Sequence, residues 1–176
     1  MCDNTLIKAG IVLGLGFGGF ADGIVLHQIL GWHHVVCNTL DCQPLSIQQL
    51  EHQNMQDGFF LLITWIVSLT GVVMLFHAAR HQVSDWSARG LFGAMLAGWG
   101  LFNFIEGMIN HQILGIHHVL PGNHQLLCDI LYLTLGLVCI YVGMRMTTSS
   151  RKQLLRQCSC EIYQLSPPYL HLITRK

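Results

Sequence analysis

Two stretches of the chain decide its fold: DGIVLHQILGWHHV at residues 22–35 and EGMINHQILGIHHV at residues 106–119. Nine of their fourteen positions are identical, at an offset of 84 residues. A second set of matches, at an offset of 72 residues, pairs Asp57 with Asp129. Self-similarity at fixed offsets indicates an internal repeat. We therefore predict two tandem copies of one structural unit.

The composition indicates a membrane protein. Hydrophobic residues make up 52% of the chain and charged residues 10%, against roughly 25% charged in ordinary soluble domains. Nine basic residues balance nine acidic ones, so nucleic acid is not an expected partner. Four apolar stretches each approach the ~20 residues that cross a bilayer: 7–30, 59–76, 91–114 and 126–144.

The predicted fold is an all-α, integral membrane four-helix bundle made of two tandem two-helix repeats. Helices are expected because hydrocarbon offers no hydrogen bonds to backbone groups. Repeat one covers 7–76 and repeat two covers 91–146 of a membrane domain at 1–146, with a cytoplasmic tail at 147–176. Two spans per repeat keep the copies parallel, so a pseudo-two-fold axis along the membrane normal brings equivalent residues together.

Basic residues predict the orientation. Lys8, Arg80 and Arg145 lie at the ends or between the spans that we assign to one side, whereas 31–58 and 115–125 contain no Lys or Arg. The positive-inside rule places those two loops outside and both termini in the cytoplasm. We expect a multi-pass protein of the bacterial inner membrane, with the lipid bilayer as its constant partner.

Each copy carries the same ionisable set. It comprises a carboxylate, a His five residues later, a His pair, a further His and a second carboxylate. Copy one supplies Asp22, His27, His33, His34, His52 and Asp57; copy two supplies Glu106, His111, His117, His118, His124 and Asp129. On a straight helix, residues five apart point about 140° away from each other. A carboxylate and its His can therefore face one atom only if the helix is distorted, and Gly23 and Gly107 could allow this.

The helical rise predicts three layers of these groups. His27, His111, Asp57 and Asp129 form the expected middle layer, with Asp22 and Glu106 beneath it and the two His pairs above it as a lid. Ionisable groups within a span are costly and indicate a functional site. Imidazole with carboxylate suits copper, iron or zinc, so all of these groups except His52 and His124 are candidate metal ligands.

Several alternatives remain at this stage. His27 and His111 could instead be the axial ligands of a haem b, and a membrane redox metalloenzyme, a small transporter or a purely structural protein would also fit the pattern. Our working prediction is metal handling at the periplasmic face, with a respiratory oxidase or another recipient as partner. A transporter with only four spans would act as a homo-oligomer.

The quoted stretches, together with QDGFF at 56–60 and GWGLFNFIEGMINHQILGIHHV at 98–119, resemble a bacterial family of predicted four-span membrane proteins known only as a domain of unknown function. The resemblance covers roughly residues 9–146. It implies inner-membrane location and no particular activity. Its signature positions are Asp22, His27, His33, His34, Glu106, His111, His117 and His118.

Overall fold

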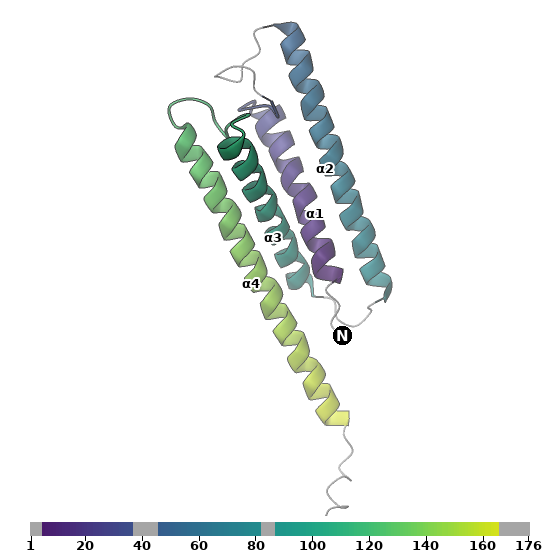
Figure 1. Cartoon of the computed structure of the whole chain (residues 1–176). Coiled ribbons are helices and arrows are strands. Elements are labelled where there is room, and N and C mark those ends of the chain that lie inside the picture. The colour runs from purple at the N-terminus through teal and green to yellow at the C-terminus, as the bar shows by residue number, and fades with distance from the viewer. Residues whose placement is uncertain (1–4, 37–45, 82–86, 166–176) are drawn as a thin grey trace, which may run out of the picture.

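The computed structural model describes residues 5–36, 46–81 and 87–165, and within these residues every regular element is a helix. The elements are α1 (Thr5–Ala21), η1 (Asp22–Ile29), α2 (Ile47–His81), α3 (Ala88–Glu106), η2 (Gly107–Ile113) and α4 (Gln125–Leu165) (Figure 1). Four continuous helical stretches are long and apolar enough to cross a membrane: Thr5–Ile29, Ile47–Arg80, Ala88–Ile113 and Gln125–Ser150. The prediction of an all-helical fold with four apolar spans is confirmed.

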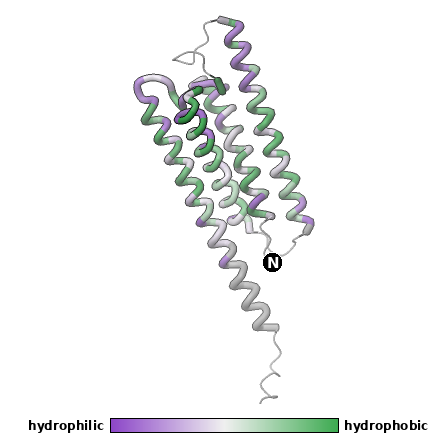
Figure 2. The backbone as a smooth tube through the Cα atoms, in the orientation of Figure 1, coloured by the Kyte–Doolittle hydropathy of each residue, from purple (hydrophilic) through white to green (hydrophobic). Residues whose placement is uncertain are grey.

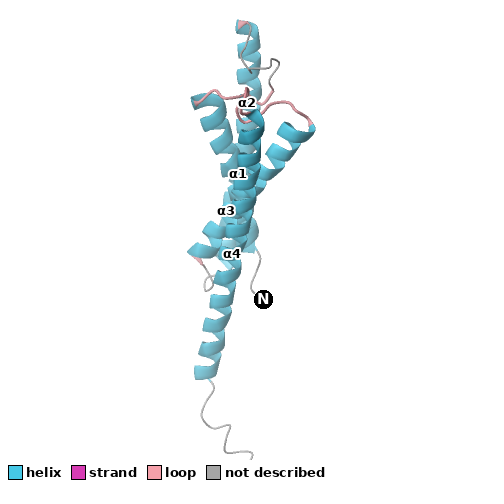
Figure 3. Ribbon diagram, turned by 90° about the vertical axis from the view of Figure 1, so that its left-hand side faces the viewer, coloured by secondary structure: helices cyan, strands magenta, loops and turns pink. Residues whose placement is uncertain are grey.

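The four helices pack in a row. The central α1 packs against α2 on one side and α3 on the other, and α3 packs against α4 (Figure 1). Viewed at 90° to this row, the helices overlap in a narrow profile (Figure 3). The two outer helices are therefore the more exposed: 17% of the apolar windows of α2 and α4 is buried, against 50% and 44% for the spans that contain α1 and α3.

Matched glycines bring the central helices together. A Cβ atom added at Gly14 would lie 2.0 Å from the carbonyl oxygen of Met95, and one at Gly98 would lie 2.1 Å from that of Ile11. Only a glycine permits such an approach between two helix backbones. The expectation that these two glycines allow close packing is confirmed.

Two helices extend beyond the predicted spans. The helix α2 begins at Ile47 rather than near Phe59, because Ser46 caps it by accepting a hydrogen bond from Gln49 N at 3.2 Å. At the other end of the molecule, α4 continues past Met146 to Leu165 without a break. Hydrophobic residues line all four helices, whereas hydrophilic residues gather at the helix ends and connections (Figure 2).

Candidate metal centre

Each central span ends in a π-helix. Backbone hydrogen bonds in a π-helix join residues five apart, as from Leu30 N to Val25 O at 2.8 Å and from Leu114 N to Ile109 O at 2.8 Å. Side chains five residues apart therefore lie on the same face. The expected helix distortion near the matched glycines thus occurs, and it takes the form of η1 and η2.

The π-helices point each carboxylate at its His. The distance from Asp22 Oδ2 to His27 Nε2 is 3.2 Å. In the second half, the distance from Glu106 Oε1 to His111 Nε2 is also 3.2 Å. An ideal α-helix would separate these partners by about 140°, so the π-helical backbone creates the pairs.

A glycine then folds the chain back over each helix end. Gly31 has φ 57° and Gly115 has φ 58°, a left-handed conformation that glycine adopts without a steric penalty. The turns bring His33 and His117 to the inside, where they are 1% and 4% exposed. His117 Nε2 lies 2.9 Å from Glu106 Oε1, and His33 Nε2 lies 3.9 Å from Asp22 Oδ1.

Two buried triads result, each with two imidazoles and one carboxylate. The ligand atoms that each triad offers lie within 4.8 Å of one another. The first triad is Asp22, His27 and His33, and the second is Glu106, His111 and His117. All six residues are between 1% and 8% exposed, so each triad is a group of ligand-type atoms that is screened from bulk solvent.

The triads adjoin and form one cluster. The rings of His33 and His117 stack at a centroid distance of 4.6 Å and an interplanar angle of 9°. His27 contacts His33 at 4.7 Å, and His111 contacts His117 at 5.0 Å. We call the six residues of the two triads the His–carboxylate cluster.

The outer nitrogens of the stacked pair bind across the two halves of the chain. His33 Nδ1 lies 2.9 Å from the carbonyl oxygen of Val119, and His117 Nδ1 lies 2.9 Å from that of Val35. A carbonyl can only accept, so each Nδ1 carries the proton. Each Nε2 then presents a lone pair toward the carboxylates.

A second carboxylate supports the first half of the cluster from behind. Asp57 is fully buried, and its Oδ1 accepts hydrogen bonds from His27 Nδ1 at 3.1 Å and Val35 N at 3.0 Å. Its Oδ2 accepts from His34 Nδ1 at 2.6 Å and from Gln28 Nε2 at 3.1 Å. These bonds orient the His27 ring so that Nε2 faces the cluster.

The second half has a corresponding arrangement. Asp129 Oδ1 lies 3.3 Å from His111 Nδ1 and accepts a hydrogen bond from Val119 N at 3.0 Å. Its Oδ2 accepts from His118 Nδ1 at 2.7 Å. Carboxylates placed on the far nitrogen of an imidazole typically fix the tautomer of a metal ligand.

The cluster has more acceptors than protons. A neutral imidazole has one N–H, yet both ring nitrogens of His27, His111 and His117 lie within 3.3 Å of oxygen acceptors. Lone pairs therefore oppose each other unless a cation lies between them. The buried atoms without a hydrogen bond among the described residues include Asp22 Oδ1, His27 Nε2, His33 Nε2, Glu106 Oε2 and His111 Nε2. Such a group of unsatisfied atoms fits a bound ion.

His33, which follows the end of its span, is held neutral. Burial lowers the pKa of its imidazole from 6.5 to about 3, and nearby His117 and His27 add to this effect. A neutral ring keeps the Nε2 lone pair that a metal requires.

The predicted three layers are wrong in two respects. First, His33 and His117 belong to the His–carboxylate cluster rather than to a lid, because the positive-φ glycines turn them inward. Second, Asp57 and Asp129 contact the outer nitrogens of His27 and His111 rather than sharing a layer that faces the centre. Of each His pair, only the second member, His34 or His118, stays outside the cluster.

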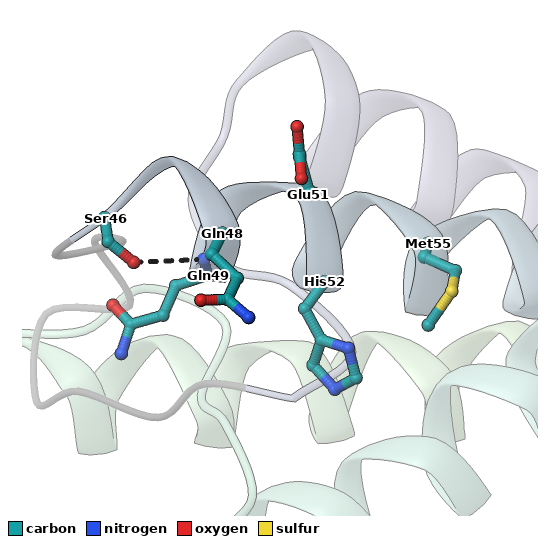
Figure 4. Close-up of a pocket in the computed structure, with 6 residues that line it drawn as sticks. All are labelled: Ser46, Gln48, Gln49, Glu51, His52 and Met55. Carbon is teal, nitrogen blue, oxygen red and sulfur yellow. Dashed lines mark hydrogen bonds between the residues drawn. The ribbon is translucent and has the colours of Figure 1, made fainter.

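The remaining repeated histidines do not reach the cluster. His52 and His124 are exposed, and His52 contacts Gln56 on its own helix at 3.3 Å. Figure 4 shows His52 in a surface hollow at the start of α2, beside Glu51 and Met55. The exposed cysteine pair considered from the sequence, Cys37 and Cys42, lies outside the described residues.

The four apolar helices and the buried ionisable cluster at one end define a polytopic membrane protein. The chain belongs to the family described as "Predicted membrane protein (DUF2243)", whose family model matches residues 9–150. No curated protein and no solved structure matches the chain. The family description assigns no activity, so the function has to be argued from the cluster.

Proposed function

We propose that the protein holds two transition-metal ions in the His–carboxylate cluster, one ion for each triad. The observation that carries this proposal is the convergence of buried Nε2 and carboxylate atoms that lack hydrogen bonds, from both halves of the chain. Buried charges need a partner or a metal. One divalent ion per triad supplies the missing positive charge.

The donor set favours iron or zinc. Two imidazoles and one carboxylate on one face are the ligands of non-haem iron sites and of many catalytic zinc sites, which keep open positions for water or substrate. Copper remains in the proposal as an ion that imidazole also binds. The described residues that contribute to the cluster include no Cys.

The packing of the rings favours ions over haem. His33 lies 4.7 Å from His27 and 6.2 Å from His111, and His117 lies 5.0 Å from His111 and 6.2 Å from His27. Both rings therefore stand between the two histidines that would be axial ligands. A macrocycle between His27 and His111 would have to displace this stacked pair.

We propose that the ions are resident rather than in transit. Every residue of the cluster is at most 8% exposed, and the outer nitrogens are fixed by carboxylates and by carbonyl groups. These features support a stable centre more than delivery of copper to a respiratory oxidase. From the basic residues we place the centre near the periplasmic face, with both termini in the cytoplasm of a bacterial cell.

Elemental analysis of the detergent-purified full chain, without a metal-affinity tag, tests the proposal. Two equivalents of one transition metal are expected in the wild type, about one equivalent in His27→Ala, and none in the double variant His27→Ala/His111→Ala. An absorption spectrum without a Soret band is expected throughout.

His52→Ala/His124→Ala is the matched control. It removes two repeated histidines that lie outside the cluster, and it is expected to retain both ions. Full metal content in His27→Ala/His111→Ala would overturn the proposal. A metal-free wild type, purified with metal in the growth medium, would also overturn it.

A further inference from the structure

An apolar cavity opens beside the second triad. Its volume is about 250 Å³, and three of the four helical spans line it. The lining residues are Leu15, Phe60, Phe102, Ile105, Glu106, Ile109 and Asn110. No step of the metal proposal uses this cavity.

The cavity opens toward the lipid. Ile105 and Ile109, which lie on its rim, are 44% and 42% exposed, and both belong to a span long and apolar enough to cross a membrane. A ligand that enters between these side chains comes from the hydrocarbon region of the bilayer. Such a ligand has to be lipid-soluble.

The walls suit an aromatic ring. Phe60 and Phe102 lie 6.1 Å apart between ring centroids, with an interplanar angle of 46°. Aromatic side chains favour offset or tilted contacts with a further ring. The cavity is somewhat smaller than the roughly 300–1,000 Å³ of most ligand pockets, so it fits one substituted ring rather than a fused system.

The cavity also has one polar end. Glu106 is 8% exposed, and its Oε2 is buried without a hydrogen bond among the described residues. The other oxygen, Oε1, faces His111 and His117 and accepts a hydrogen bond from Asn110 Nδ2 at 3.3 Å. An unsatisfied carboxylate oxygen requires a donor, and a ligand hydroxyl group provides one.

We propose that this cavity binds the ring of a lipid-soluble hydroquinone, with a ring hydroxyl donating to Glu106 and the ring between Phe60 and Phe102. The alkyl tail leaves between Ile105 and Ile109 into the bilayer. The site is specific to the second half of the chain, because Leu26 occupies the position in the first half that corresponds to Asn110. The proposal does not require metal in the cluster.

Calorimetric titration of the full chain in nanodiscs with decylhydroquinone tests this proposal. We expect saturable binding at one site. Ile109→Trp fills the cavity and should weaken binding at least tenfold, whereas Ile113→Trp should bind as the wild type does, since Ile113 is 69% exposed on the same π-helix and does not line the cavity.

Two further measurements keep the test decisive if Ile109→Trp does not fold. Asn110→Leu introduces the residue that the first half carries and should weaken binding about fivefold. Decylbenzene, which has the tail and ring without hydroxyl groups, should bind at least tenfold more weakly than decylhydroquinone. Equal binding of the two probes would mean an acyl-chain site and would overturn the proposal, as would unchanged binding in both cavity variants. Metal content measured on the same samples separates this outcome from failure of the metal proposal.

Discussion

His33 Nδ1 lies 2.9 Å from the carbonyl oxygen of Val119, a residue 86 positions later in the chain. The reciprocal contact joins His117 Nδ1 to the carbonyl oxygen of Val35 at the same distance. Each half of the chain thus fixes the tautomer of a histidine in the other half. The two contacts explain why the stacked rings of His33 and His117 can present both Nε2 atoms to the carboxylates.

Replacement of His33 should affect both folding and metal. His33→Phe keeps a ring but leaves the buried Val119 carbonyl without its donor, which costs about 1–3 kcal/mol of the free energy of unfolding. One of the two ions should also be lost. Thermal unfolding in detergent and elemental analysis measure the two effects. His52→Phe is the matched control, and an unchanged ion content in His33→Phe would argue against His33 as a ligand.

Asp57 should tune metal affinity without being a ligand. Asp57→Asn keeps the size of the side chain but removes the charge behind His27, and loss of such an outer partner typically lowers metal affinity about 10–100-fold. Competition with a chelator of known affinity measures the change, and excess metal should restore full occupancy. His27→Ala should not be restored under the same conditions. If excess metal fails to restore Asp57→Asn, then Asp57 is itself a ligand.

The sequence predicted the four helices and most of the cluster because both depend on local patterns. Apolar length specifies the spans, and the spacing of Asp22 and His27 requires a distorted helix if both residues act together. The inward turn of His33 was not predictable from helical rise, because it depends on the left-handed conformation of Gly31. The only signal was the repeated glycine itself, two residues ahead of each His pair.

Long-range contacts account for the other differences. The carbonyl groups of Val35 and Val119 have no sequence signature as partners of histidine, since every residue has a carbonyl group. The cavity beside Glu106 forms where side chains from three spans fail to fill space. Neither feature follows from the periodicity of one helix.

The close approach of α1 and α3 should make Gly98 intolerant of any side chain. In Gly98→Ala the new Cβ would lie 2.1 Å from the carbonyl oxygen of Ile11, so the helices must separate, at a cost of about 3 kcal/mol or more in the free energy of unfolding. Thermal unfolding in detergent measures the loss. Gly58→Ala is the matched control, because nothing lies within 4 Å of the added Cβ in that helix.

That control should be stabilising. Alanine in a helix interior is favoured over glycine by about 0.5–1 kcal/mol, so Gly58→Ala should unfold at a higher temperature than the wild type. Equal stability of Gly98→Ala and Gly58→Ala would contradict the packing of α1 on α3.

Tyr132 should be dispensable for metal binding even though it contacts the cluster. Its ring lies 5.6 Å from that of His111, and Phe60, which holds the corresponding position in the first half, lies 5.5 Å from His27. The Tyr132 hydroxyl is buried and forms no hydrogen bond with the described residues. Tyr132→Phe should therefore keep both ions and should match the wild type in stability or exceed it by up to about 1 kcal/mol.

The reverse exchange provides the comparison for Tyr132→Phe. Phe60→Tyr adds a hydroxyl group next to apolar Leu15 and Phe102, the other walls of the cavity, and burial without a partner should lower the free energy of unfolding by about 1–3 kcal/mol. Elemental analysis and thermal unfolding on both variants separate the two roles of the ring and the hydroxyl. Loss of an ion in Tyr132→Phe would make the hydroxyl a ligand of the second triad, because the phenyl ring that remains preserves the contact with His111.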